Sequence, residues 1–208
     1  MIKLSYDVEK YRQDILDLVE PEDTVIELGC HTGGTTRLIP ESCSIIALDN
    51  SPEAEDSMKK LPHVKFINAD VRLHDVLAEV FKMTQSCDIL AIDLGGGYHP
   101  DTVFKVFYIW SSTFKPKHTL IRNRGVLEFC NSAESSGEDY VSKNGYLESY
   151  HDSGIPPQIK EFDLWTDSLK KDEWFFSFFY YKIIVFRQYL IKKLSYFLML
   201  IIENWLFL

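Results

Sequence analysis

Residues 25–39 read VIELGCHTGGTTRLI, and this stretch contains the most informative turn of the chain. A short apolar run ends at Gly29, and the glycine- and threonine-rich segment that follows leads toward a helix. Glycine allows the positive φ angles and close backbone approaches that such a turn needs. The stretch therefore predicts a buried strand followed by a ligand-binding turn. His31 stands where a glycine-rich nucleotide loop carries its second glycine.

Apolar runs and helical segments alternate around this turn. The runs at 24–28, 44–48, 64–67, 88–92 and 118–121 predict strands, and segments 8–19, 71–83 and 100–114, with helix starts at Thr35 and Ser51, predict helices. Strands that are apolar on both faces are typical of a parallel sheet covered by helices. Because parallel crossovers are right-handed, the pattern favours a doubly wound α/β fold, a three-layer α/β/α sandwich with a mostly parallel sheet.

The composition narrows the class of protein. The chain has 208 residues, enough for one main domain, and a formal net charge of -9. Such a charge disfavours nucleic-acid binding through a broad basic face. The four scattered cysteines form no CxxC pair, which is typical of a reducing compartment. The N-terminal segment MIKLSYDVEKYRQDILDLVE has no apolar signal region, so we expect a cytoplasmic protein.

Acidic residues stand at the ends of four consecutive predicted strands. They are Glu27, Asp49, Asp70 and Asp93. Ligands of doubly wound sheets bind at the carboxyl ends of the strands. A carboxylate at Asp49 suits the two hydroxyls of a ribose, and one at Asp70 suits the exocyclic amine of adenine. Single aspartates are often helix caps, but their recurrence at successive strand ends favours a nucleoside site.

These segments together resemble the class I S-adenosylmethionine-dependent methyltransferases. EDTVIELGCHTGGTT resembles motif I of that family, IIALDNSP its acidic motif after the second strand, FINADV the segment after the third, and CDILAIDLGGG the motif of the fourth. The resemblance extends over residues 11–128 in the family's order. It implies S-adenosylmethionine as the cofactor and methyl transfer as the activity.

The resemblance also implies roles for individual residues. Glu27 is expected near the amino group of the cofactor, Gly29 and Gly33 beneath its methionine and ribose portions, Asp49 at the ribose hydroxyls, and Asp70 with the Val71 backbone around the adenine. His31 and Asp93 complete the predicted cofactor site. NAD is the alternative cofactor, since residues 29–34 can be aligned with GxGxxG. His31 disfavours it, because a pyrophosphate needs the middle glycine for close approach.

The candidate catalytic residues are Asp93 and His99. Methyl transfer from a sulfonium relies largely on positioning, and a base is needed only where the acceptor loses a proton. We expect no metal, because Arg122-Asn123-Arg124 follows the last predicted strand instead of further acids. The two arginines suit an anionic acceptor, since guanidinium binds carboxylate and phosphate groups well. A small-molecule acceptor is favoured.

The chain is expected to divide into three parts. Residues 1–130 form the Rossmann-like S-adenosylmethionine-binding core, 131–173 a polar lid or linker, and 174–208 an aromatic and apolar segment. The last segment is compatible with a homodimer interface, a peripheral membrane contact or a tail altered relative to the ancestral reading frame. This segment and His31 also support an alternative function, a non-catalytic binding or scaffold protein on a methyltransferase-like fold.

Overall fold

The computed structural model describes residues 1–96, 99–137 and 141–148. The chain divides into two compact units, Met1–Asp163 and Leu164–Leu208, and every described residue belongs to the first. The predictions made for residues 174–208 therefore lie outside the described residues. Among the described helices, none has the length and apolar character needed to cross a membrane.

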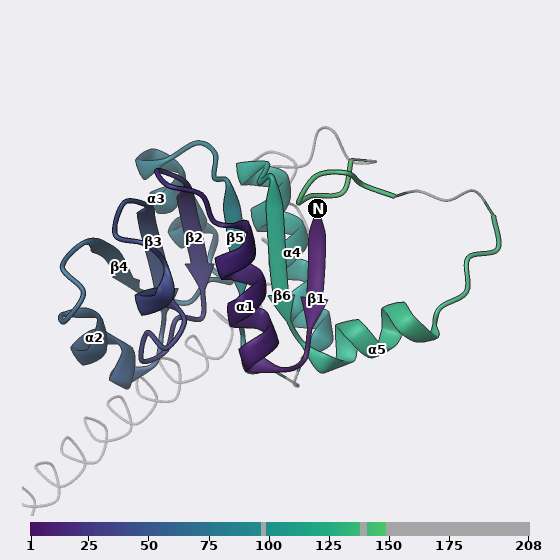
Figure 1. Cartoon of the computed structure of the whole chain (residues 1–208), viewed down its shortest axis with the longest axis horizontal. Coiled ribbons are helices and arrows are strands. Elements are labelled where there is room, and N and C mark those ends of the chain that lie inside the picture. The colour runs from purple at the N-terminus through teal and green to yellow at the C-terminus, as the bar shows by residue number, and fades with distance from the viewer. Residues whose placement is uncertain (97–98, 138–140, 149–208) are drawn as a thin grey trace, which may run out of the picture. The chain divides into compact units, whose positions relative to one another are not determined.

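One sheet of six parallel strands forms the centre of the first unit (Figure 1). Its order is β1-β6-β5-β2-β3-β4, and the strands are β1 (Ile2–Ser5), β2 (Thr24–Leu28), β3 (Ser44–Asp49), β4 (Val64–Asn68), β5 (Ile89–Ile92) and β6 (His118–Arg122). The strand order reverses between β2 and β5, where doubly wound sheets bind ligands. This architecture confirms the predicted doubly wound α/β fold.

Strand β1 was not among the predicted strands. It is only four residues long, and Lys3 interrupts its apolar pattern. Its partner is β6, with Leu4 opposite Ile121 in parallel register. Parallel pairing between the first and last strands of the described sheet depends on tertiary contacts, so a short, mixed segment gives little local signal for it.

Helices cover both faces of the sheet. They are α1 (Val8–Leu18), α2 (Pro52–Met58), α3 (His74–Met83), α4 (Pro100–Phe114) and α5 (Arg124–Ser132), with a single 3-10 turn η1 (Thr36–Leu38). Figure 1 shows α1 in front of the sheet and α4 behind it. Tyr11 and Ile15 of α1 pack into one buried cluster with Val25, Ile45 and Ile89. Because side chains alternate along a strand, the intervening residues of each strand face the opposite layer.

The predicted boundary at residue 130 falls inside α5, which ends at Ser132. Beyond it, residues 141–148 contact the amino-terminal end of β6. The Gly145 backbone N–H donates to the Pro116 carbonyl at 3.0 Å, and the Thr119 hydroxyl donates to the Gly145 carbonyl. This described part of the predicted lid or linker therefore contacts the end of β6 opposite to its carboxyl end. The division into core, lid and tail stays a prediction.

Candidate functional site

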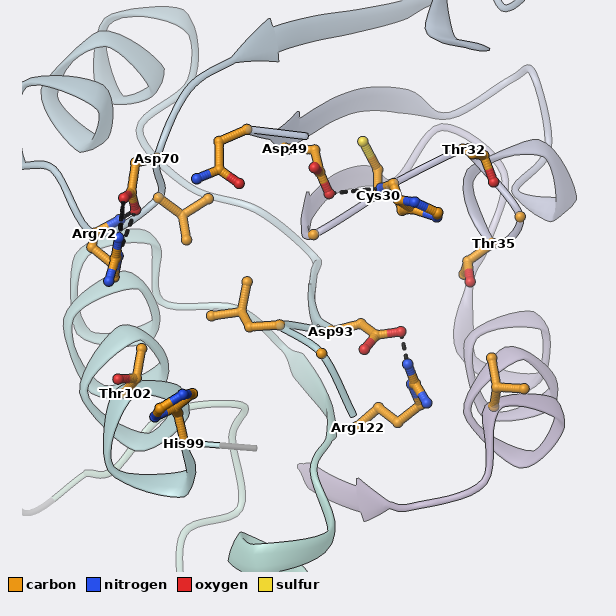
Figure 2. Close-up of a pocket in the computed structure, with 18 of the residues that line it drawn as sticks. Cys30, Thr32, Thr35, Asp49, Asp70, Arg72, Asp93, His99, Thr102 and Arg122 are labelled. Carbon is orange, nitrogen blue, oxygen red and sulfur yellow. Dashed lines mark hydrogen bonds and ion pairs between the residues drawn. The ribbon is translucent and has the colours of Figure 1, made fainter. Parts of the chain in front are cut away.

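A cavity of about 630 Å³ opens at the carboxyl ends of the strands. Its volume is in the usual range for small-molecule and cofactor sites. The lining comes from α1, from the loops after β2, β3, β4 and β5, from the start of α4 and from the end of β6: Val8, Arg12, Gly29, Cys30, His31, Thr32, Gly34, Thr35, Asp49, Asn50, Ala69, Asp70, Val71, Arg72, Asp93, Leu94, Gly95, His99, Thr102 and Arg122 (Figure 2).

The loop after β2 depends on glycine at two positions. Gly29 has a φ of 87°, and a Cβ there would lie 2.1 Å from the carbonyl oxygen of Asp93. Gly33 has a φ of 74°, and a Cβ there would meet the Met58 methyl carbon at 2.6 Å. Gly29 lines the cavity, whereas Gly33 packs toward α2. The two glycines thus let the loop pass close to β5 on one side and α2 on the other.

His31 also adopts a left-handed conformation, with a φ of 45°. Histidine is among the residues that tolerate this region better than most, so the loop keeps the backbone path that glycine would favour. The His31 backbone N–H donates to Oδ2 of Asp49 at 2.7 Å. The residue that departs from the glycine pattern therefore helps to position Asp49, the last residue of β3.

Asp49 lies at the end of β3 and lines the cavity. Its Oδ2 accepts from His31, and its Oδ1 accepts from the Ser51 backbone N–H at 2.7 Å. A carboxylate offers about four acceptor sites, so each oxygen can accept a further hydrogen bond from a ligand. The two backbone donors fix the orientation of the carboxylate in the cavity.

Asp70 follows β4 and forms a forked ion pair with Arg72. The Arg72 Nε lies 2.8 Å from Oδ1 and 3.0 Å from Oδ2, and a terminal nitrogen donates to Oδ2 as well. Burial raises the pKa of Asp70, but the hydrogen bonds from Arg72 outweigh this and hold it below its ordinary value. Val71 between them lines the cavity, and its carbonyl accepts from the Trp110 indole at 2.9 Å.

Asp93 follows β5 and pairs with Arg122 at the end of β6. The Arg122 Nε lies 2.7 Å from Asp93 Oδ2, and the two side chains are 23% and 15% exposed. The other oxygen, Oδ1, is buried and has no hydrogen-bond partner among the described residues. An unsatisfied buried acceptor is costly, so this atom is suited to receive a donor from a ligand.

Glu27 lies on β2 beneath the cavity and is not part of its lining. It is 1% exposed, and its Oε2 accepts from the Thr36 hydroxyl at 2.6 Å. Burial raises the pKa of Glu27 to about 7, against the opposing hydrogen bond from Thr36, and the negative charges of Asp93 and Asp49 add to the rise. Glu27 is thus buried and outside the cavity lining, and its expected role beside the cofactor's amino group stays a prediction.

His99 caps the start of α4 in a left-handed conformation, with a φ of 50°. Figure 2 shows His99 next to Thr102 and apart from the Asp93–Arg122 pair. Both predicted catalytic residues thus line the cavity, at separate places in it, and their catalytic role stays a prediction. Arg124, the second predicted anion-binding arginine, lies 5.4 Å from the Tyr6 ring and does not line the cavity.

The lining residues that were not predicted from the sequence include Arg12, Arg72 and Thr102. Arg12 comes from α1, and its Nε lies 3.4 Å from the Thr35 hydroxyl. Its position next to the buried Tyr11 places it at the border of the apolar face of the helix, which is the signal that could have identified it. Arg72 stands two residues after Asp70, a spacing at which side chains in a turn can meet. Thr102 lies in the first turn of α4.

Metal ligands do not cluster in the part of the chain that the structure describes. No group of three or more histidine, cysteine, aspartate or glutamate side chains there could hold an ion.

Several solved structures resemble the chain. A TehB-like SAM-dependent methyltransferase from Corynebacterium glutamicum is 13% identical, with 42% of this chain and 45% of that chain covered and a TM-score of 0.31. A candidate rRNA methylase from Clostridium thermocellum is 16% identical, with 65% and 83% covered and a TM-score of 0.45. Fibrillarin from Aeropyrum pernix, solved with S-adenosyl-L-methionine, is 18% identical, with 49% and 46% covered and a TM-score of 0.35. The chain thus spans less than half the length of the first and third of these proteins.

Comparison with protein families gives a longer match. The FtsJ-like methyltransferase family matches residues 2–147, which is more than half of the chain and includes every residue that lines the cavity. No curated protein sequence matches significantly.

Proposed function

Because the chain belongs to the FtsJ-like methyltransferase family, we propose that it transfers a methyl group from S-adenosylmethionine to a small-molecule acceptor. The observation that carries this proposal is a cavity of about 630 Å³ that is lined by Asp49, Asp70 and Asp93 from three successive strand ends. Three acids in one cavity give separate partners for a ribose, a purine amine and an acceptor.

The residues of the cavity fit this cofactor. Asp49, held by two backbone N–H groups, would bind the ribose hydroxyls. Asp70 and Val71 would frame the adenine. The loop that contains Gly29 would lie along the methionine portion, since at Gly29 the backbone passes too close to Asp93 for any side chain. Bound there, S-adenosylmethionine supplies a methyl group activated by its sulfonium charge.

The acceptor would lie beside Asp93. Its Oδ1 is buried without a partner among the described residues, so it can accept a hydrogen bond from the O–H or N–H group that is methylated and then take up its proton. Arg122 holds the other oxygen and keeps the carboxylate oriented. Arg12 adds a cation to the lining, which suits an acceptor with an anionic group near the reacting atom.

Calorimetric titration with S-adenosylhomocysteine tests the cofactor part of the proposal. The full chain should bind it with a micromolar Kd, and Asp49→Ala should weaken binding about tenfold, the effect of one charged hydrogen bond to a ligand. Absence of binding at high micromolar concentration would contradict the proposal. Mass spectrometry of the purified protein gives an independent measurement, the presence of a co-purified adenosyl ligand.

A methylation assay tests the acceptor part. Incubation of the protein with methyl-labelled S-adenosylmethionine and a cell extract should place label in the low-molecular-weight fraction. Label in the RNA or protein fraction would leave the cofactor assignment intact and show that the acceptor class is wrong. Binding without transfer to any fraction would favour the non-catalytic alternative.

A further inference from the structure

Arg72 takes up most of the hydrogen-bonding capacity of Asp70. Oδ1 accepts from the Arg72 backbone N–H at 2.9 Å and from Nε at 2.8 Å, and Oδ2 accepts from Nε and a terminal nitrogen. A carboxylate has about four acceptor sites. Three N–H groups of Arg72 therefore occupy about three of the acceptor sites of Asp70, and about one site is left for a ligand.

The pair lies at one end of the cavity. Figure 2 shows Asp70 and Arg72 on the side of Thr102 and away from Thr32 and Thr35. The Asp70 side chain is 19% exposed, and that of Arg72 is 34% exposed. Both residues line the cavity, so the remaining acceptor site of Asp70 is accessible to a ligand while its orientation is fixed by the fork.

We propose that Arg72 is a specificity-determining residue, which makes the purine end of the site accept a 6-amino purine and reject a 6-oxo purine. The proposal rests on the proposed function, because it assigns the adenine of the cofactor to Asp70. Arg72 acts through Asp70 by holding it as an oriented anion with one free acceptor site. An amino group donates to that site, whereas a carbonyl oxygen meets a negative charge.

The same contacts explain why the selectivity depends on Arg72. Burial alone would raise the pKa of Asp70, and the hydrogen bonds from Arg72 reverse that rise. Without the guanidinium, Asp70 would titrate at a higher pH and would rotate more freely. A protonated carboxyl can donate to a carbonyl oxygen, so the discrimination between the two purines would fall.

Competition between two ligands that differ at this position tests the proposal. S-adenosylhomocysteine and S-inosylhomocysteine differ in the 6-amino and 6-oxo groups, and calorimetry with the full chain gives the ratio of their Kd values. We expect the wild type to prefer the adenosyl compound by at least about a hundredfold and Arg72→Ala to lower this ratio at least about tenfold. Arg72→Lys keeps a cation without the fork and should give an intermediate ratio.

The control is Lys65→Ala, which removes an exposed cation from β4, the strand that leads to Asp70. Its ratio should equal that of the wild type. A pH series adds a readout that a purely structural role would not change: the ratio for Arg72→Ala should decline toward acid at a higher pH than the wild-type ratio. Should Arg72→Ala fail to fold, Arg72→Lys and Asp70→Asn give the same comparison.

An unchanged ratio in folded Arg72→Ala would overturn the proposal, and so would tighter binding of the adenosyl compound, because Arg72 would then compete with the purine for Asp70. These outcomes differ from a failure of the proposed function. In that case, the wild type would bind neither compound.

Discussion

Two aspartate–arginine pairs line the same cavity, and they differ in how many hydrogen-bond acceptor sites remain on the carboxylate. Asp70 and Arg72 stand two residues apart in one loop, and the guanidinium contacts both carboxylate oxygens. Asp93 and Arg122 stand 29 residues apart on neighbouring strands, and their contact leaves Asp93 Oδ1 without a partner among the described residues. The first pair leaves about one acceptor site of Asp70, which suits recognition, whereas the second leaves a whole carboxylate oxygen of Asp93 available for chemistry.

The register of the sheet explains why the Asp93–Arg122 pair leaves one carboxylate oxygen without a partner among the described residues. Ile92 of β5 lies opposite Ile121 of β6, so Asp93 and Arg122 are neighbours just beyond the last paired residues. Their geometry is fixed by strand register and not by a local turn, which gives a single Nε contact in place of a fork.

Gly29→Ala should have the largest effect, because it moves the backbone that carries Asp93. The new Cβ would lie 2.1 Å from the Asp93 carbonyl oxygen, at a φ of 87° that alanine rarely adopts. We expect the free energy of unfolding to fall by about 4 kcal/mol, the upper range for a single substitution. Urea unfolding of the full chain measures this.

Gly95→Ala is the matched control for that substitution. Gly95 has a similar φ of 91°, but a Cβ there would have no atom within 4 Å among the described residues. It should therefore show only the conformational cost of about 1 kcal/mol. Equal losses for the two variants would mean that close approach to Asp93 does not constrain the loop.

Asp93→Asn should separate the roles of the two pairs. The amide keeps the shape of the side chain but loses the charge and the ability to take up a proton. We expect kcat to fall by about 100- to 1000-fold, with the Kd for S-adenosylhomocysteine changed by less than about threefold. Asp70→Asn should show the reverse, a weaker cofactor affinity with kcat at saturation nearly unchanged. Methyl-transfer kinetics with the identified acceptor decide between these outcomes.

Glu27→Gln should reveal a third acid that has a hydroxyl partner instead of a guanidinium fork. Burial raises the pKa of Glu27 from 4.5 to about 7 in the folded chain. Between these two values the folded state keeps a proton that the unfolded state releases. The associated stability is complete below pH 4.5 and is lost as the pH rises through about 7, a change of about 3 kcal/mol.

Glutamine does not titrate and can still accept from the Thr36 hydroxyl. Between pH 5 and pH 8, the wild type should therefore lose about 2.5 kcal/mol more than Glu27→Gln. Urea unfolding at both pH values gives the difference and cancels the contributions of the other titrating groups. Parallel slopes for the two proteins would show that Glu27 is ionised in the folded state at both pH values.

The sequence predicts most of the fold and only part of the site. Five of the strands follow from apolar runs whose ends agree with the structure within one residue. Four of these runs are mostly buried on both faces, which makes the pattern strong, whereas the edge strand β4 is only half-buried. Asp49, Asp70 and Asp93 line one cavity, as their positions after these strands predict. The sequence thus predicts which residues lie at the ligand-binding edge of the sheet, because the carboxyl ends of all parallel strands meet at that edge.

The sequence does not predict which side chains of the site contact each other or how deeply each one is buried. Glu27 precedes its glycine by two residues, yet the pleat of β2 turns it under the loop instead of into the cavity. His31 interrupts the glycine pattern, yet the loop accepts it because histidine tolerates the left-handed conformation, and its backbone N–H donates to Asp49. Arg72 contacts Asp70 through its guanidinium, and this contact depends on the rotamer of a long side chain. Such features depend on torsion angles and tertiary contacts that no residue pattern encodes locally.

Arg122→Lys should have the smallest effect and gives the sharpest contrast with Arg72→Lys. Arg122 contacts Asp93 through one nitrogen, so a lysine ammonium can replace it as a point charge. We expect kcat to change by less than about fivefold, about 1 kcal/mol in activation free energy. The Arg72 guanidinium binds both oxygens of Asp70 through Nε and a terminal nitrogen, and lysine cannot reproduce this fork. The two lysine variants therefore compare charge with geometry: if Arg122→Lys loses as much activity as Asp93→Asn, the Asp93–Arg122 pair also depends on guanidinium geometry.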